Sequence, residues 1–196
     1  MLRIIGGQAR GVHLKTPKWQ GTRPMTDKVR EAVFNILGPD VAGARVLDLY
    51  AGTGAVGLEA LSRGAASVVA VDMSGKCAQL IRENARLAKL DKYMQVHKQR
   101  VETFIQQRLA VSDQSSAKTT DQVAMFDLIF FTPPYAIFSF DLLCQAGDLL
   151  SANRTLVAEM ATRDPIDGFK IQNSKFTMQS VREYGDTRVM FLIKSS

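Results

Sequence analysis

The segment DLYAGTG at residues 48–54 has the residue types and spacing of a cofactor-binding turn. It follows an apolar run, and Gly52, Gly54 and Gly57 match the pattern G-x-G-x-x-G. Glycines let the chain turn sharply and let a ligand approach the backbone without meeting a Cβ atom. Asp72, about 20 residues after Gly52, is placed to bind a ribose diol. Taken alone, this pattern fits either a dinucleotide or S-adenosylmethionine.

The charge at this turn separates the two cofactors. A pyrophosphate group needs bare backbone amides and the positive end of a helix, and a carboxylate beside them would repel it. Asp48 ends the preceding strand, so we expect its carboxylate at the mouth of the site. A negative charge there suits the ammonium and sulfonium groups of S-adenosylmethionine. We therefore predict that cofactor, with an NAD-dependent oxidoreductase as the remote alternative.

A second candidate loop, Thr132-Pro133-Pro134-Tyr135, follows the apolar run at residues 126–131. Its two prolines fix the backbone and leave the Pro133 carbonyl without a helix or strand partner. The Thr132 hydroxyl offers a second acceptor, and the Tyr135 ring offers a stacking surface. Methylation of an exocyclic amine on a nucleobase needs these groups, because two acceptors hold the N–H bonds while stacking holds the ring. Strand ends line the ligand crevice of a parallel sheet, so this loop should face the glycine-rich turn.

Strands that alternate with helices must position both loops. The strands are predicted at residues 45–50, 67–72, 94–98, 126–131 and 154–160. The helices between them are predicted at residues 55–63, 74–88, 101–109 and 138–150. Because the strand runs are nearly all apolar, we expect an α/β fold whose mostly parallel sheet is covered on both faces. Further strands at residues 169–171, 176–182 and 189–193, with a Gly-Asp-Thr turn, predict an antiparallel hairpin at the end of the sequence.

The first 40 residues read as a small addition to this fold. Short β-like runs at residues 2–5 and 12–15 predict a hairpin. Thr26 is a candidate N-cap for a helix that ends at Gly38, and Lys28 and Arg30 lie off its apolar stripe. We therefore expect residues 1–40 to form a hairpin and helix, and residues 41–196 to form the main domain. Residues 111–122 are polar and predict a surface loop.

Composition excludes several classes of protein. The sequence has 196 residues and a net charge of +6, and residues 1–40 hold seven Lys and Arg against three acids. Such a basic end predicts a polyanionic partner, nucleic acid first. No apolar stretch is long enough for a membrane span. Two cysteines and two histidines make a metal site improbable, and residues 1–20 contain no serine, so we reject a transit peptide and expect a cytoplasmic protein.

Long segments of the sequence resemble one known family. RPMTDKVREAVFN at residues 23–35 resembles the segment RPT-x-DRVREALFN of the RsmD family, and LDLYAGTGAVGLEALSRGA at residues 47–65 resembles its first motif. The opening segments RIIGG and RG and the late segment YGDT also resemble that family, so the resemblance covers almost the whole chain. It implies a class I, seven-stranded methyltransferase fold. It also implies methyl transfer from S-adenosylmethionine to guanine N2 in small-subunit (16S) ribosomal RNA.

The resemblance and the motifs together give three sets of expected site residues. The acceptor loop, expected to be catalytic, is Thr132, Pro133, Pro134 and Tyr135. The cofactor-binding residues are expected to be Asp48, Tyr50, Ala51, Gly52, Thr53, Gly54, Asp72, Met73, Arg100 and Val101. The residues expected to contact RNA are Arg3, Arg10, Lys15, Arg23, Lys28 and Arg30. No metal ion is expected, and the partner is ribosomal RNA or an assembling small subunit, bound by a monomer.

Two residues depart from the family pattern. Thr132 stands where the family usually has Asp, so the loop lacks a charge that would stabilise the positive amine formed in the reaction. Arg100 aligns with a position where the family commonly has Asp, whose carboxylate accepts a hydrogen bond from the adenine amine of the cofactor. A guanidinium group cannot accept a hydrogen bond. These departures keep open a catalytically weakened RNA-binding or assembly protein on the same fold. Transfer to adenine N6 or to DNA also stays open, because the four-residue loop does not separate these acceptors.

Overall fold

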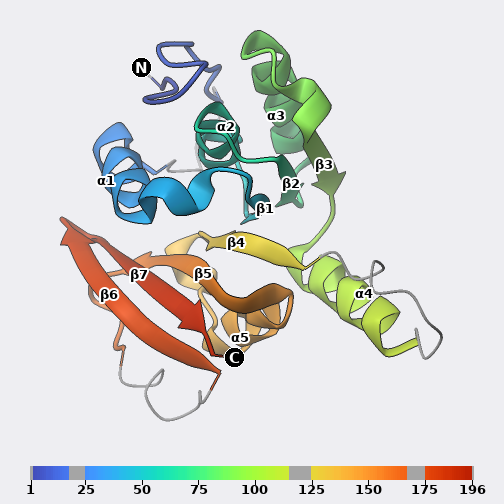
Figure 1. Ribbon diagram of the computed structural model, residues 1–196, viewed down its shortest axis with the longest axis vertical. Coiled ribbons are helices and arrows are strands. Elements are labelled where there is room, and N and C mark those ends of the chain that lie inside the picture. The colour runs from blue at the N-terminus through green and yellow to red at the C-terminus, as the bar shows by residue number, and fades with distance from the viewer. Residues whose placement is uncertain (1, 18–24, 115–124, 167–174, 196) are drawn as a thin grey trace. The chain divides into compact units, whose positions relative to one another are not determined.

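The computed structural model describes residues 2–17, 25–114, 125–166 and 175–195 (Figure 1). The chain forms two units, Met1–Gln99 and Arg100–Ser196. The first unit contains all of the glycine-rich turn, and the second contains the Thr132–Tyr135 loop. Residues on both sides of the expected division at residue 40 belong to the first unit. These two units do not test that division, so it stays a prediction.

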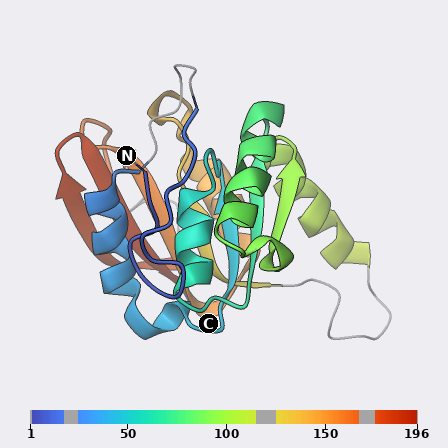
Figure 2. The ribbon, with the colours of Figure 1, turned by 90° about the horizontal axis from the view of Figure 1, so that it is seen from above.

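The first unit is built on a three-stranded parallel sheet. Its strands are β1 (Arg45–Leu49), β2 (Ser67–Asp72) and β3 (Met94–Lys98), in the order β3-β2-β1. The helices α2 (Ala55–Ser62) and α3 (Gly75–Leu87) lie side by side on one face of this sheet (Figure 2). Ser74 caps α3 by accepting from the Cys77 amide, as residues of its type do at helix starts.

The N-terminal part of the first unit is a loop and a helix. Helix α1 (Asp27–Leu37) begins after Thr26, whose hydroxyl accepts from the Val29 amide as predicted, and a short 3-10 turn (Gly38–Val41) follows it. Residues 2–5 and 12–15 pair in the antiparallel sense, as the predicted hairpin requires: the Ile4 amide donates to the Val12 carbonyl at 3.0 Å, the Leu14 amide donates to the Leu2 carbonyl at 2.9 Å, and Arg3 and His13 form a bridge. The amides of Ile5, Gly6 and Ala9, at the end of the first run and in the turn, bond to α2.

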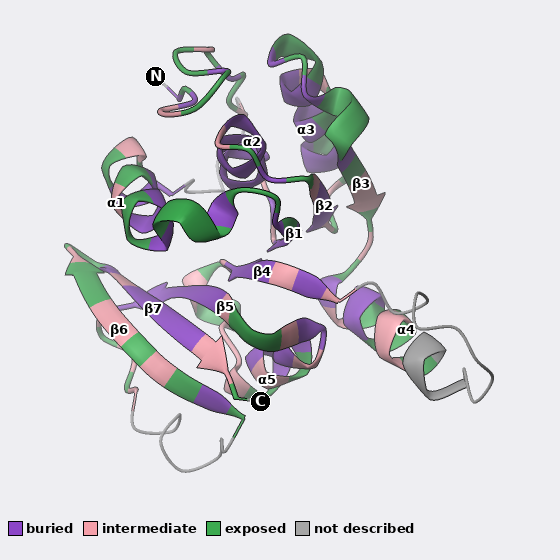
Figure 3. Ribbon diagram, in the orientation of Figure 1, coloured by how far each residue is buried: buried purple, intermediate pink, exposed green. Residues whose placement is uncertain are grey.

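The second unit contains the other four strands. They are β4 (Phe126–Phe131), β5 (Leu150–Ala161), β6 (Phe176–Tyr184) and β7 (Thr187–Lys194), in the order β4-β5-β7-β6. Strands β4 and β5 are parallel, whereas β7 runs antiparallel to β5 and β6. Helix α5 (Phe140–Asp148) packs against β4 and β5, and the residues of β7 are more buried than those of β6 (Figure 3).

The predicted fold class is confirmed. Seven strands, parallel except at the C-terminal hairpin, follow the strand order 3-2-1-4-5-7-6. Helix α4 (Val101–Gln114) runs beyond its predicted end, so residues 111–114 are helical and the prediction of a loop there is wrong. Strand β5 also starts earlier than predicted, where its pairing with β4 shifts register. The strand predicted at residues 169–171 lies outside the described residues. In the described part of the chain, no helix combines the length and apolar character needed to cross a bilayer.

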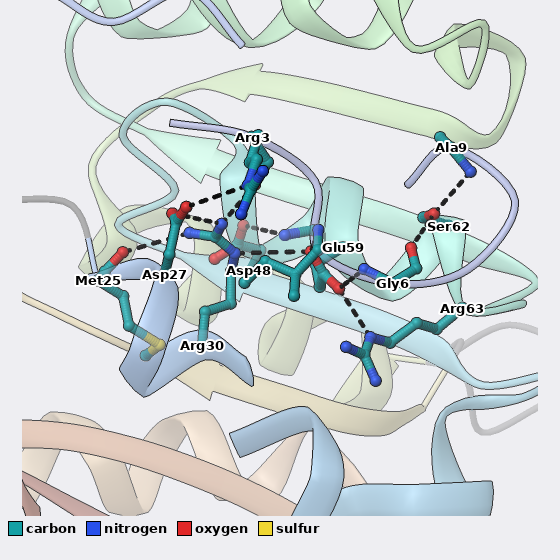
Figure 4. A network of polar contacts seen from close by, with 12 residues as sticks. Arg3, Gly6, Ala9, Met25, Asp27, Arg30, Asp48, Glu59, Ser62 and Arg63 are labelled. Atoms are coloured by element: carbon teal, nitrogen blue, oxygen red, sulfur yellow. Dashed lines mark hydrogen bonds and ion pairs between the residues drawn. The ribbon is translucent and has the colours of Figure 1, made fainter. Parts of the chain in front are cut away.

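A buried carboxylate joins the N-terminal segment to α2 (Figure 4). Glu59 accepts hydrogen bonds from the amides of Ile5 and Gly6 at 2.7 and 2.8 Å and from Arg63 Nε at 2.7 Å. It also lies 3.6 Å from Arg30 Nε, and neither side chain has any exposed surface. Glu59 therefore fixes the N-terminal segment to α2.

Arg30 is placed differently from the prediction. It was expected on the exposed face of its helix and in contact with RNA, but its guanidinium is fully buried. Its nitrogens donate to the carbonyls of Arg3 and Met25 and to the Asp27 carboxylate. The expected exposed position is therefore wrong, because the side chain joins segments of the protein to one another, and the RNA contact itself stays a prediction.

Replacing Glu59 should destabilise the protein strongly. Glu59→Gln removes the charge that faces Arg30 and Arg63, and breaking a buried ion pair costs about 3 kcal/mol or more. Denaturant unfolding monitored by circular dichroism measures the change. The matched control is Glu31→Gln on exposed α1 surface, which should change the free energy of unfolding by less than about 0.5 kcal/mol. Equal effects of the two substitutions would contradict this account.

Candidate active site

The turn after β1 is strained in a way that opens its backbone. Tyr50, Gly52 and Gly54 all have positive φ angles, of 63°, 54° and 77°. The Gly54 amide closes the turn by donating to the Ala51 carbonyl at 2.7 Å. A Cβ atom on Gly52 would come near only the Tyr50 carbonyl, at 3.8 Å, so a ligand can approach this backbone. A Cβ atom on Gly54 would instead lie 3.0 Å from Ile81, which makes this glycine a packing requirement.

The Asp72 carboxylate accepts hydrogen bonds from backbone amides of two different loops. Its Oδ2 accepts from the Gly52 amide at 2.9 Å, and its Oδ1 accepts from the Ser74 amide at 2.8 Å. Its backbone carbonyl accepts from the Gln99 amide at 3.0 Å. The side chain is only half-buried, and each oxygen keeps a lone pair that can accept from a ribose hydroxyl. Beside it, Met73 is 61% exposed and offers an apolar surface for a purine ring.

Asp48 is buried beneath the turn instead of standing at its mouth. Its Oδ2 accepts from the Gly57 amide at 3.1 Å, which draws the carboxylate under the first turn of α2. Burial, together with the like charge of Asp72, raises the pKa of Asp48 to about 7. Its Oδ1 has no hydrogen-bond partner among the described residues. Asp48 has no exposed surface to offer a ligand, so its role here is to hold the start of α2 through the Gly57 amide.

The side chain of Asn84 ties this turn to the N-terminal segment. It is fully buried on α3, and its Oδ1 accepts from the Lys15 amide at 2.8 Å. Its Nδ2 donates to the carbonyls of Lys15 and Thr53, at 3.1 and 2.9 Å. Sequence analysis did not identify this residue, because an Asn inside a helical pattern carries no local signal of such a role.

The loop of the second unit is rigid and anchored by Tyr135. The loop enters a short 3-10 turn (Tyr135–Ile137). The Tyr135 hydroxyl lies 3.1 Å from Glu159 Oε1 and 2.6 Å from Thr187 Oγ1, and both partners are buried. Thr132 and the Tyr135 ring are half-buried, while Pro133 is buried. The ring is thus fixed at its hydroxyl end and remains partly accessible for stacking.

Glu159 and Thr187 were not predicted from the sequence. They lie on β5 and β7, far from the loop along the chain, and only strand pairing brings them beside Tyr135. Arg100 is exposed and precedes α4, and Val101 is buried in its first turn. These two residues belong to the second unit, so their role at the cofactor turn stays a prediction.

The residues expected to contact RNA are mostly exposed. Arg10 and Lys28 lie on the surface, Arg3 is 61% exposed, and Lys15 is 57% exposed in an ion pair with Glu83. Arg23 lies outside the described residues. These positions remain available to a polyanion, in contrast to the buried Arg30.

Comparison with known proteins assigns the chain to a family. The family model described as Conserved hypothetical protein 95 matches residues 2–193. The chain belongs to this family, the RsmD family. Ribosomal RNA small subunit methyltransferase D of Haemophilus influenzae is 33% identical over 158 residues, which cover 79% of this chain and 73% of that protein. The Escherichia coli K12 protein of the same name is 49% identical over 83 residues, which cover 42% of each chain.

Solved structures confirm the fold. The Thermus thermophilus protein TTHA0928 is 30% identical, with a TM-score of 0.76 over 99% of both chains. SMU.776, solved in complex with SAH, is 18% identical with a TM-score of 0.70, over 86% of this chain and 50% of its own. The chain is therefore an RsmD-family methyltransferase with the class I methyltransferase fold.

The residues of the turn fit S-adenosylmethionine. The half-buried Asp72 carboxylate lies beside the open backbone of Gly52, which favours a cationic ligand over a pyrophosphate. The open backbone at Gly52 and the exposed Met73 provide the close approach and the apolar surface that the cofactor needs. The role of these residues in binding the cofactor stays a prediction.

The raised pKa of Asp48 should make stability fall as pH rises. In the unfolded chain this carboxyl loses its proton near pH 3.8, whereas the folded protein keeps the proton until about pH 7. The folded state therefore binds more protons across this interval, and its stability declines between about pH 4 and 7. Relative to Asp48→Asn, the wild-type protein should lose roughly 4 kcal/mol over that range, measured by urea unfolding at successive pH values. Parallel pH profiles would contradict this account.

Removing the Tyr135 hydroxyl should slow methyl transfer without weakening cofactor binding. Tyr135→Phe leaves Glu159 and Thr187 without this partner, so the ring loses its fixed position. We expect kcat to fall about tenfold, which corresponds to roughly 1.4 kcal/mol. The dissociation constant of S-adenosylmethionine, measured by calorimetry, should stay unchanged. Tyr184→Phe on β6 is the matched control and should leave both quantities unchanged. Loss of cofactor affinity in Tyr135→Phe would show a wider structural effect.

Proposed function

We propose that this protein transfers a methyl group from S-adenosylmethionine to the exocyclic N2 of a guanine in small-subunit ribosomal RNA. The observation that carries the proposal is the relationship to proteins named Ribosomal RNA small subunit methyltransferase D, which extends over 79% of this chain in the Haemophilus influenzae relative. The basic N-terminal segment supports an RNA substrate, because its exposed Arg3, Arg10 and Lys28 suit phosphate contacts.

The acceptor loop suits an exocyclic amine held for reaction. The target guanine leaves its stack, at a cost of a few kcal/mol, and its ring docks on Tyr135. The Thr132 hydroxyl and the Pro133 carbonyl each accept one N–H of the amino group. Among the described residues, no hydrogen bond engages the Pro133 carbonyl, so it is available for this contact. The two acceptors turn the nitrogen lone pair out of the ring plane and toward the donor.

Little acid–base chemistry is needed once the two groups are aligned. Bound S-adenosylmethionine supplies an electrophilic methyl group on a sulfonium sulfur. The guanine nitrogen would form the new C–N bond as the bond between the methyl carbon and the sulfonium sulfur breaks, which leaves S-adenosylhomocysteine. The nitrogen, now cationic, would then lose its proton readily to water. The protein's contribution is position, since near-attack geometry supplies much of such a rate. That the Thr132–Tyr135 loop faces the turn after β1, as expected from the sequence, stays a prediction.

Mass spectrometry of digested RNA tests the proposal directly. Small-subunit ribosomal RNA from cells that lack the gene, incubated with this protein and S-adenosylmethionine, should gain one N2-methylguanosine. S-adenosylmethionine should also raise the melting temperature, whereas NAD should not. Methylated adenine, or methylation of DNA in preference to RNA, would replace the guanine proposal. A thermal shift with NAD alone would favour an oxidoreductase.

Thr132 offers a test of how the acceptor loop works. A carboxylate at this position would stabilise the positive charge that develops on the attacking nitrogen, and a preorganised polar group contributes about 10²- to 10³-fold in rate. Thr132→Asp should therefore raise kcat for guanine methylation by about tenfold or more, measured with radiolabelled methyl donor. Thr132→Val, which keeps the shape and removes the acceptor, should lower kcat. Unchanged or lower activity of Thr132→Asp would show that the pocket is built around the hydroxyl.

A further inference from the structure

A basic pocket of about 340 Å³ lies between the N-terminal segment and the end of α2. Arg3 and Arg10 line it from the N-terminal segment, Arg63 lines it from the residue after α2, and Glu31 lines it from α1. Its other lining residues, Ile4, Ile5, Gly6 and Gly11, carry no side-chain charge. Three guanidinium groups therefore face one carboxylate in a single pocket, which favours an anionic ligand.

Arg63 is the fixed member of this group. Its Nε donates to the buried Glu59 at 2.7 Å, and its guanidinium carbon lies 5.2 Å from the centre of the Phe34 ring. It also packs on the backbone of Gly6, where a Cβ atom would come within 2.6 Å of its Nη2. The side chain is 21% exposed, and its Nη atoms have no hydrogen-bond partner in the described part of the chain. Two donor groups are thus held in place beside an open pocket.

Arg3 and Arg10 are the adjustable members. Arg10 is exposed and makes no ion pair with a described residue. Arg3 lies 3.9 Å from Asp27, but the two side chains are 61% and 39% exposed, so this pair contributes little. The planar guanidinium group of arginine can donate two parallel hydrogen bonds to the oxygens of a phosphate group. An arginine side chain that is already held in place loses less conformational entropy on binding than a mobile one. The fixed guanidinium group of Arg63 and the two mobile ones of Arg3 and Arg10 can together donate to several oxygens of one phosphodiester group.

We propose that this pocket binds one backbone phosphate of the RNA substrate. Arg63 provides the preset contact, and Arg3 and Arg10 close around the same phosphate. The inference rests on the proposed function, because that function supplies the RNA. It goes beyond the charge of the N-terminal segment, since it assigns a defined pocket and adds Arg63, a residue from the end of α2.

Replacing Glu31 tests the proposal, because its effect on RNA affinity should be opposite to the effect of replacing Arg10. Its carboxylate is exposed and has no ion pair with a described residue, so its charge opposes a bound phosphate. Removing that charge should strengthen RNA binding, whereas removing Arg10 should weaken it. A general loss of stability would weaken binding in both variants, so opposite effects identify the pocket.

The experiment is RNA binding by fluorescence anisotropy across a salt series, with a labelled fragment of small-subunit ribosomal RNA. At about 0.15 M salt, Arg10→Gln should weaken binding about five- to tenfold and lower the salt slope by about 0.7–0.9, the contribution of one phosphate contact. Glu31→Gln should tighten binding about two- to threefold. Arg86→Gln, which removes an exposed charge on α3, is the matched control and should change affinity less than twofold.

Each other outcome overturns the phosphate site. Equal losses in Arg10→Gln and Arg86→Gln would show a diffuse charge effect, and weaker binding by Glu31→Gln would show that the pocket takes no anion. Inorganic phosphate that raises the melting temperature in an Arg10-dependent way, with RNA affinity unchanged, would assign the pocket to a small anion. Arg63→Gln is read together with its unfolding curve, because Arg63 also bonds to Glu59.

Failure of the proposed function is a separate result. RNA that binds with the expected changes in Arg10→Gln and Glu31→Gln, but gains no methyl group on guanine, would support the pocket and contradict the reaction. Guanine methylation by the wild-type protein, with no change in the salt slope of Arg10→Gln, would support the reaction and contradict the pocket.

Discussion

The buried carboxylate of Glu59 is the interaction on which the organisation of the first unit depends. It satisfies two backbone amides of the N-terminal segment and faces the guanidinium groups of Arg30 and Arg63. It lies on α2, a helix of eight residues that begins at the cofactor turn and ends beside the basic pocket. One short helix therefore sets the position of both the cofactor turn and the proposed phosphate site.

The two candidate loops obtain their rigidity in different ways. The turn after β1 depends on carboxylates, because Asp48 and Asp72 each accept from a backbone amide and the half-buried Asp72 creates a negative environment. The Thr132–Tyr135 loop carries no charge of its own and is held by its prolines and by the Tyr135 hydroxyl. A cationic cofactor and a neutral amine are the ligands that these two environments suit.

Sequence reasoning predicted the elements and the local motifs well. Strands at residues 67–72 and 126–131 have the predicted bounds, because buried parallel strands read as continuous apolar runs. The strand at residues 94–98 also has the predicted bounds, although only its first residue is buried. It failed for Arg30, whose burial depends on Glu59, a partner 29 positions away that no helical pattern reveals. It also missed Asn84, Glu159 and Thr187, since their contacts arise from tertiary packing between distant segments.

The contact made by Asn84 has a consequence for how this protein can change over time. All three of its hydrogen bonds go to main-chain atoms, those of Lys15 and Thr53. The exposed Lys15 side chain can therefore be exchanged without breaking the junction, whereas a change at Asn84 itself would break it. The N-terminal segment is thus free to diversify its sequence at this position while its attachment to α3 is preserved.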